Sequence, residues 1–99
     1  MKIWVDDVRP APEGYVLEKS VWGAQWFIEF CEEMGNTIEL IDLDHDAGDY
    51  KSLGGDFIKI LDWLEETGRN YPIRIHSMNP IGVENMRRII RRNGWTEVR

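Results

Sequence analysis

Residues 38–46 read IELIDLDHD, a mostly hydrophobic run that ends in an Asp-His-Asp sequence. A run of this length, bounded by turn residues, is typical of a buried strand in a parallel sheet. The same order, a short hydrophobic run followed by polar residues, occurs at residues 3–7 and 73–77. Because open α/β sheets bind ligands at the carboxyl ends of their strands, we expect these three segments to form one site.

The composition is that of one small globular domain. The chain has 99 residues, of which 42% are hydrophobic, so we assign residues 1–99 to a single domain with one core. No hydrophobic run is long enough to cross a bilayer, and the N-terminal residues do not form a signal peptide. The single cysteine, Cys31, cannot form an internal disulfide, which fits a reducing compartment. We therefore predict a cytoplasmic protein that does not contact a membrane.

The net charge limits the classes of ligand. A formal net charge of −6 argues against binding of long nucleic acids, because affinity for polyanions comes mainly from Lys and Arg. A local pocket can still hold one small phosphate or the end of an RNA strand. The basic residues Arg87, Arg88, Arg91 and Arg92 gather near the C-terminus, where we expect a solvent-exposed stripe on a helix.

Short strands alternate with helices along the chain. Strands are predicted at residues 2–5, 15–19, 38–43, 73–75 and 95–98, with the second at an edge of the sheet. Helices are predicted from the N-cap Ser20 to about Met34, from Asp56 to near Gly68, and from Asn79 to about Asn93. This alternation predicts a mostly parallel sheet of four to five strands, and right-handed crossovers are expected to place helices on both faces. The predicted fold is an α/β three-layer sandwich.

The helix after Ser20 carries a hydrophobic stripe. The residues spaced to face the core are Val21, Ala24, Phe27, Ile28, Cys31 and Met34. Trp22 and Trp26 lie on or beside this stripe, and Trp63 lies beside the stripe of the next helix. Tryptophan can stack on nucleobases, but we expect these three residues to pack against the core.

Three acids follow two of the predicted strands. Asp6 and Asp7 come after the first strand, and Asp44 comes after the third. Together they would form an oxygen-rich cluster suited to a hard cation such as Mg²⁺. Such a cluster needs a cation or a basic partner to offset the repulsion between its carboxylates. The alternative is that Asp7 only caps the loop that leads to Arg9.

His45 and His76 are the only histidines, and each lies just past a predicted strand. Imidazole is the side chain best suited to proton transfer near neutral pH. Two imidazoles beside one phosphate can act as base and acid, and Asp44 or Asp46 can orient His45. On the residues alone, a structural role for each histidine is an equal alternative.

The segment after His76 predicts a small anion site. Asn79 is a typical N-cap, and the free amides of the first helical turn, including that of Gly82, can bind a phosphate together with the Ser77 hydroxyl. Ordinary capping by Asn79 is compatible with this role. Arg9 is expected either to pair with an acid or to bind a phosphate.

The order of these segments resembles a known domain. The sequence IWVDD at residues 3–7, a strand that ends in Asp44 and another that ends in Ser77 resemble the receiver domain of two-component response regulators. The resemblance implies a flavodoxin-like topology in which the acid pair holds Mg²⁺ and Asp44 accepts a phosphoryl group. Receivers carry a Lys after the fifth strand, whereas residues 94–99 contain none, and the last helix of a receiver is also missing.

A closer resemblance is to the cyclic-phosphate processing receiver-like domains. Residues 6–12 (DDVRPAP), 43–48 (LDHDAG) and 76–82 (HSMNPIG) look like the motifs of this divergent group. Ala47 stands where we expect a larger apolar residue, a difference that touches no reactive group. The resemblance implies turnover of cyclic phosphates, in nucleotides or at RNA ends, by paired histidines.

Three hypotheses follow for the function. The first is a phosphoesterase that opens a small cyclic phosphate with His45 and His76, with Mg²⁺ or Mn²⁺ at the acid cluster. The second is a non-enzymatic receiver-like module that binds a ligand or a protein, and the sequence specifies no protein partner. The third is a phosphoacceptor at Asp44, which the missing Lys disfavours.

Overall fold

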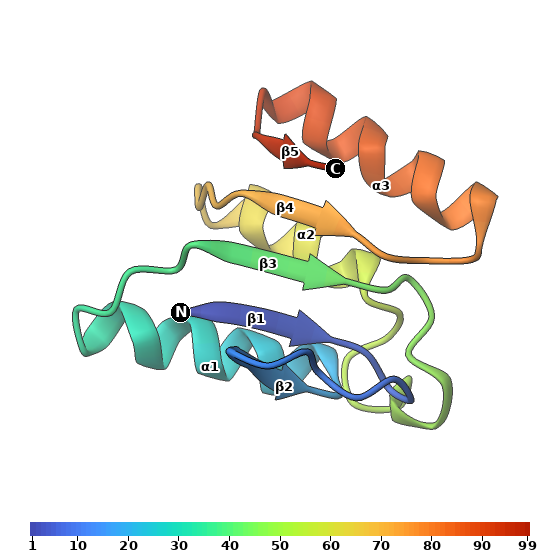
Figure 1. Ribbon diagram of the computed structural model, residues 1–99. Coiled ribbons are helices and arrows are strands. Elements are labelled where there is room, and N and C mark those ends of the chain that lie inside the picture. Colours follow the sequence, from blue (N-terminus) through green and yellow to red (C-terminus); the bar gives the residue numbers. More distant parts are fainter.

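The computed structural model describes residues 1–99 and contains one five-stranded sheet (Figure 1). The strands are β1 (Lys2–Val5), β2 (Tyr15–Glu18), β3 (Leu40–Leu43), β4 (Ile73–Ile75) and β5 (Glu97–Val98). The helices are α1 (Val21–Glu33), α2 (Ile58–Glu66) and α3 (Pro80–Asn93), with a short 3₁₀ helix, η1, at Gly48–Tyr50. All strand pairs are parallel, and the order β2-β1-β3-β4-β5 is the flavodoxin-like order. The predicted α/β class and receiver-like topology are confirmed.

The helices form one layer, not the two layers of the predicted three-layer sandwich. The crossovers through α1, α2 and α3 all step across the sheet in the same direction, so right-handed connections place all three helices on one face. Only the link from β1 to β2 steps the other way, and residues 6–14 contain no helix. The two layers were expected from the alternation of strands and helices, but a second layer needs a helix between β1 and β2, where the chain has none.

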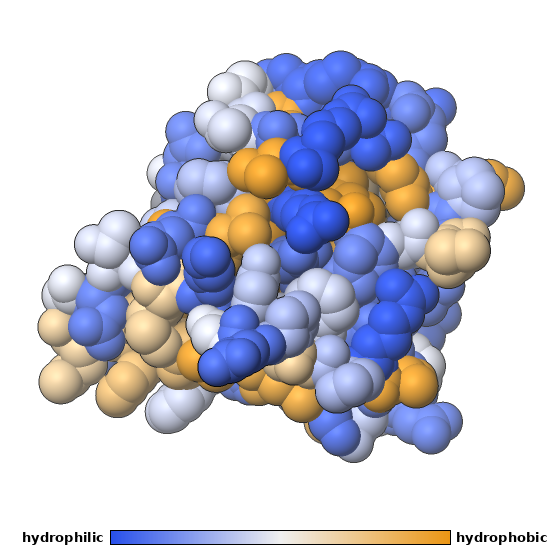
Figure 2. Space-filling model, in the orientation of Figure 1, coloured by the Kyte–Doolittle hydropathy of each residue, from blue (hydrophilic) through white to orange (hydrophobic).

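A single hydrophobic core lies between the helices and the sheet. Alternate strand residues such as Ile3, Val5, Ile41 and Leu43 are fully buried, together with residues of all three helices. The opposite face of the sheet is only partly covered by its own side chains. It is seen in Figure 2 as a mixture of hydrophilic and hydrophobic residues. This open face matters for the site, because the ring of His76 lies over it, stacked on Trp4.

Two of the three predicted helix starts are confirmed. The Ser20 hydroxyl accepts a hydrogen bond from the Gly23 amide at 3.0 Å, and Asn79 accepts one from Gly82 at 3.0 Å. The helix predicted from Asp56 begins two residues later, at Ile58. The Asp56 carboxylate instead accepts a hydrogen bond from the Ala47 amide at 3.0 Å, so Asp56 stabilises the preceding loop.

Some of the residues predicted to lie in the core are exposed instead. Val21, Ala24, Ile28 and Cys31 are buried as expected, Phe27 is partly buried, and Trp63 packs against the core. Trp22, Trp26 and Met34 are 59%, 64% and 63% exposed. Successive members of this set are four and eight positions apart, on the side of α1 that faces away from the sheet, where no helix or strand covers them.

Three of the four C-terminal arginines are paired rather than merely solvated. Arg87, Arg91 and Arg92 lie 2.8, 2.6 and 2.9 Å from glutamate oxygens. Such pairs at an exposed surface contribute little to stability. Because their charges are already paired, these arginines do not indicate a binding site for an anion. No helix of the structure is both long enough and apolar enough to span a membrane.

Candidate functional site

The three acids predicted to cluster do lie together at the carboxyl ends of the strands. Val5 of β1 pairs with Leu43 of β3, so the chain leaves both strands side by side just before Asp6 and Asp44. Carboxylate oxygens of Asp6, Asp7 and Asp44 all lie within 4.8 Å of one another. A donor set made of carboxylate oxygens fits a hard divalent cation.

Asp6, not Asp7, caps the loop that leads to Arg9. Its Oδ1 accepts the amides of Val8 and Arg9, each at 2.9 Å, and its side chain is buried. Burial by itself raises the pKa of Asp6, but the hydrogen bonds from Arg9, Val8 and His76 bring it below its usual value. Asp6 is therefore held ionised and has a structural task besides any binding role.

The surroundings of Asp7 disfavour its charged form. Burial and the charges of Asp6, Asp44 and Asp49 raise the pKa of Asp7. Gly48 packs against this side chain, with φ +54°, and a Cβ there would lie 2.2 Å from Asp7 Oδ2. The absence of a side chain at Gly48 therefore leaves the space that the Asp7 carboxylate occupies.

Asp7→Asn is expected to increase the free energy of unfolding at neutral pH in the presence of EDTA, because it removes a repulsive charge. The pKa of Asp7 is higher in the folded than in the unfolded protein, so folding favours the protonated form. The contribution of wild-type Asp7 to stability should therefore improve as pH falls from 7 through its folded pKa, and Asp7→Asn should lack this gain. Urea unfolding at several pH values measures both effects, and a variant less stable than wild type at pH 7 would contradict the assignment.

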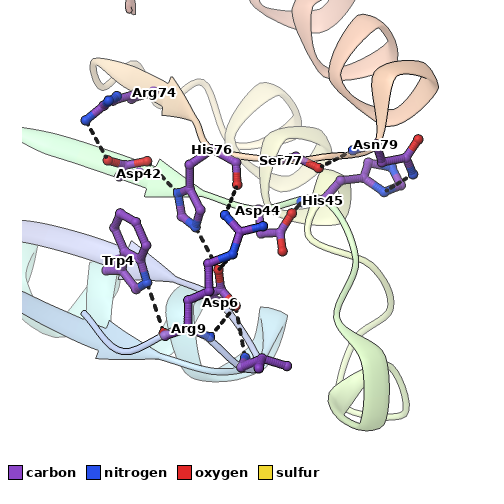
Figure 3. A network of polar contacts seen from close by, with 11 residues as sticks. Trp4, Asp6, Arg9, Asp42, Asp44, His45, Arg74, His76, Ser77 and Asn79 are labelled. Carbon is purple, nitrogen blue, oxygen red and sulfur yellow. Dashed lines mark hydrogen bonds and ion pairs between the residues drawn. The ribbon is translucent and has the colours of Figure 1, made fainter. Parts of the chain in front are cut away.

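His76 does not extend from the rim but lies back over the open face of the sheet (Figure 3). Its Nδ1 is 2.6 Å from Asp42 Oδ1, and its Nε2 is 2.9 Å from Asp6 Oδ2. The ring stacks on Trp4, with centroids 3.7 Å apart and planes inclined by 7°. A protonated imidazole donates both hydrogen bonds, whereas a neutral one donates only one.

Asp42 is the site residue that the sequence analysis missed. It is fully buried in β3, in register with Trp4 on one side and Arg74 on the other. Its Oδ2 has no hydrogen-bond partner, and the nearest cation is Arg74 Nη1 at 3.6 Å. The signal was present, because Asp42 interrupts the hydrophobic run of residues 38–43 and a charged residue in a buried strand needs a partner.

His45 belongs to a separate carboxylate–imidazole pair. Its Nδ1 is 2.7 Å from Asp46 Oδ1, and its Nε2 has no hydrogen-bond partner. Asp44 instead accepts the backbone amide of His45 at 2.7 Å. The hydrogen bond with His45 is the main reason that the pKa of Asp46 is lowered, with a further contribution from Asn79. A proton on Nδ1, shared with Asp46, leaves the Nε2 lone pair free to accept another.

Gly82 makes room for the His45 ring rather than offering an open amide. A Cβ at this position would lie 2.5 Å from His45 Cγ. The Gly82 amide already binds the Asn79 side chain, and the Asn79 amide binds the Ser77 hydroxyl oxygen at 3.1 Å. The anion site predicted at the start of α3 is therefore narrower than expected. It offers the Ser77 hydroxyl hydrogen and the amide of Ile81, which has no backbone partner.

Arg9 is loosely held at the same edge. Its Nε is 3.9 Å from Asp6 Oδ2, and its Nη1 is 3.5 Å from the His76 carbonyl oxygen. The side chain is 45% exposed. Both contacts are long, so the guanidinium can turn toward an anion at little cost.

A second group of possible metal ligands consists of His45, Asp46 and Asp56. Asp56 already binds the Ala47 amide and lies 3.4 Å from Lys51 Nζ, which supplies a positive charge within the protein. In the acid cluster only Asp6 has basic partners, Arg9 and His76, and Asp7 and Asp44 form no ion pair, so this cluster is the more favourable of the two for a cation.

A parallel sheet in this order, with acids after β1 and β3 and a serine after β4, defines a receiver-like α/β protein. Residues 1–92 match the family described as the cyclic-phosphate processing receiver domain, and the chain belongs to that family. The family description links the domain to the processing of cyclic phosphates. No significant match was found among curated proteins or solved structures.

Proposed function

We propose that the protein is a phosphoesterase that hydrolyses a small cyclic phosphate, in a nucleotide or at an RNA end. The observation that carries the proposal is the geometry of His45, whose Nδ1 is held by Asp46 while its Nε2 has no partner. This arrangement suits general acid–base catalysis, because the carboxylate orients the ring and stabilises its protonated form. The family to which the chain belongs supports the class of substrate.

The proposed reaction needs one proton removed and one supplied. His45 Nε2 takes a proton from a water molecule as the water oxygen bonds to phosphorus. The ring P–O bond breaks, and the released sugar oxygen takes a proton to become a hydroxyl, which gives a phosphomonoester. His76 is the proposed acid for this second step, and its Nε2 must first leave Asp6 Oδ2, which lies at 2.9 Å.

The phosphate group would lie between the start of α3 and the loop after β1. Ser77 can donate its hydroxyl hydrogen, because its oxygen accepts the Asn79 amide and the hydrogen is free. The Ile81 amide and the Arg9 guanidinium are the other available donors. Asn79 orders this region by capping α3 and by lying 3.4 Å from Asp46.

Mg²⁺ or Mn²⁺ is the proposed cofactor, held by Asp6, Asp7 and Asp44. The convergence of the three carboxylates supports the assignment, and the pKa of Asp7 is raised first by burial and then by the charges of Asp6, Asp44 and Asp49. A bound divalent cation would neutralise these acids and would polarise the phosphate oxygens of the substrate. Asp6 would keep its amide hydrogen bonds through Oδ1 in either state.

Mg²⁺ or Mn²⁺ is expected to raise the melting temperature. At a cation concentration tenfold above Kd the gain is about 1.4 kcal/mol, by mass action on the folded state. This corresponds to a shift on the order of 5–10 °C for a domain of this size. Asp7→Asn should remove most of the shift, whereas Asp49→Asn removes a nearby charge but no proposed ligand and should keep it. Equal metal responses in both variants and in wild type would place the cation elsewhere.

The function is tested by measuring turnover of 2′,3′-cyclic nucleotides, 3′,5′-cyclic nucleotides and RNA oligomers with 2′,3′-cyclic phosphate ends. The expected result is a phosphomonoester product from at least one class, with Mg²⁺ or Mn²⁺ present. Incubation with acetyl phosphate, followed by mass measurement of the intact protein, tests phosphorylation of Asp44. A stable phosphorylated protein without turnover would overturn the proposal.

A second candidate function is a receiver-like module that binds a cyclic phosphate without hydrolysing it. The observation that favours it is that both nitrogens of His76 are occupied by carboxylates. Calorimetric titration with the same cyclic nucleotides separates the two functions. Binding with unchanged ligand after long incubation supports the module, and release of monoester supports the enzyme.

A further inference from the structure

We propose that the outer face of α1 is a docking surface for a basic amphipathic helix of another protein. The surface is formed by Trp22, Trp26, Phe30 and Met34, called here the aromatic stripe. This proposal concerns the face away from the sheet and does not depend on the activity proposed for the acids and histidines.

The aromatic stripe is continuous because its members are four residues apart. Residues at this spacing lie on one side of a helix, so the stripe runs along all of α1, for about 18 Å. The four side chains are 59%, 64%, 40% and 63% exposed, in chain order. Single exposed hydrophobic residues are common, but a row of large ones on one helix is typical of an interaction site.

The middle of the stripe is shaped to receive side chains. The rings of Trp26 and Phe30 stack with centroids 5.4 Å apart. Together with Glu29 and Glu33 they line a shallow hollow of about 340 Å³. The carbonyl oxygen of Leu53 accepts a hydrogen bond from the Trp22 amide, which places Leu53 at the Trp22 end of the stripe. Leu53 is 41% exposed and extends the apolar surface at that end.

The charges around the stripe specify the partner. The sequence of α1 contains Glu29, Glu32 and Glu33 but no Lys or Arg. Glu32 is neutralised by Arg69, whereas Glu29 and Glu33 form no ion pair. Two unpaired carboxylates beside an aromatic row complement a helix with an apolar stripe flanked by Lys or Arg. A cation of the partner can also lie on the face of Trp26.

The same charges disfavour the other occupants. A second copy packed stripe to stripe would bring glutamates together in a protein of net charge −6. An anionic lipid surface would be repelled in the same way. A basic helix is the occupant for which apolar contact and charge act together.

The test uses a synthetic peptide of about 18 residues, long enough for roughly 27 Å of helix, with Leu at every fourth position and Lys beside it. Calorimetry and the tryptophan fluorescence of the full chain report binding. We expect saturable binding of this peptide, with a blue shift of the emission. A scrambled peptide of the same composition should bind at least tenfold more weakly.

Two variants locate the binding surface. Trp26→Ala combined with Phe30→Ala should weaken binding at least tenfold, while leaving the buried residues of α1 in place. Glu29→Lys combined with Glu33→Lys should reverse the preference, so that a Leu/Glu peptide binds better than the Leu/Lys peptide. The matched control is Glu13→Lys combined with Glu66→Lys, which changes the net charge equally at exposed positions outside α1.

Each outcome decides the proposal. If the control variant loses binding as much as the α1 charge variant, the attraction is general to an acidic protein and the proposal fails. It also fails if the scrambled peptide binds as tightly as the amphipathic one. Dimerisation of the wild-type chain that Trp26→Ala abolishes would assign the stripe to a second copy instead.

Discussion

His76→Ala is expected to lower the free energy of unfolding by about 3–5 kcal/mol, the usual cost of removing one partner of a buried ion pair. In the intact protein Asp42 is fully buried, and without the imidazole its nearest cation would be Arg74, at 3.6 Å. Trp4 also loses the ring that stacks on it. Small domains are stable by about 5–15 kcal/mol in total, so this is a large fraction.

The double variant Asp42→Ala, His76→Ala distinguishes a buried charge from a loss of packing. Removing Asp42 as well should recover part of the stability, because no uncompensated carboxylate then remains in the sheet. Urea unfolding of wild type, both single variants and the double variant gives this coupling energy. If the double variant is less stable than His76→Ala, the unpaired charge of Asp42 is not the cause.

His45→Ala is expected to reduce turnover of the cyclic phosphate by ~10²–10⁴-fold, the usual contribution of one general acid–base group. Its effect on stability should be much smaller than that of His76→Ala, because Asp46 is 60% exposed and remains solvated without the ring. Added imidazole should restore part of the activity, since the variant leaves a space beside Gly82. Product formation measured with and without imidazole gives both results.

Two further variants test the position of His45 rather than its presence. Asp46→Asn keeps the ring but weakens its orientation, so we expect a smaller loss of kcat than in His45→Ala. Gly82→Ala places a methyl group where the ring now lies, which must move or tilt His45. Full activity in Gly82→Ala would show that the present ring position is not the working one.

Much of the fold could be predicted because its signals are local. Helix starts can be predicted from Ser20 and Asn79, whose side chains accept amide hydrogen bonds, and from Pro80, which has no amide hydrogen to donate. Strands of three or four residues can be predicted from short hydrophobic runs. The acid cluster also followed from the sequence, since parallel strands end at the same edge of the sheet. The single layer of helices was missed, because only a helix between β1 and β2 would lie on the opposite face, and residues 6–14 contain none.

The site was harder to predict where it depends on side-chain direction. His45 and His76 both follow neighbouring strands, which suggested a pair acting across one phosphate. Leu43 pairs with Ile75, so His76 is the first residue after its strand and His45 is the second after its own. In the structure each ring turns toward its own carboxylate, and no hydrogen bond joins them. The direction of His76 is set by Asp42 and Trp4, which lie on the open face of the sheet and belong to other strands.

The open sheet face has a consequence for which substitutions the protein tolerates. Along β1, Ile3 points into the core, whereas its neighbour Lys2 is exposed, so a library selected only for folding should vary freely at Lys2 and little at Ile3. Trp4 and Asp42 also lie on the open side, but both contact His76 and should therefore tolerate fewer substitutions than Lys2. In a library that carries a neutral residue at both Asp42 and His76, Trp4 should become more variable, while Ile3 remains restricted. Trp4 should stay less variable than Lys2, because its Nε1 still donates to the Arg9 carbonyl oxygen and its ring still packs edge-on against Tyr15.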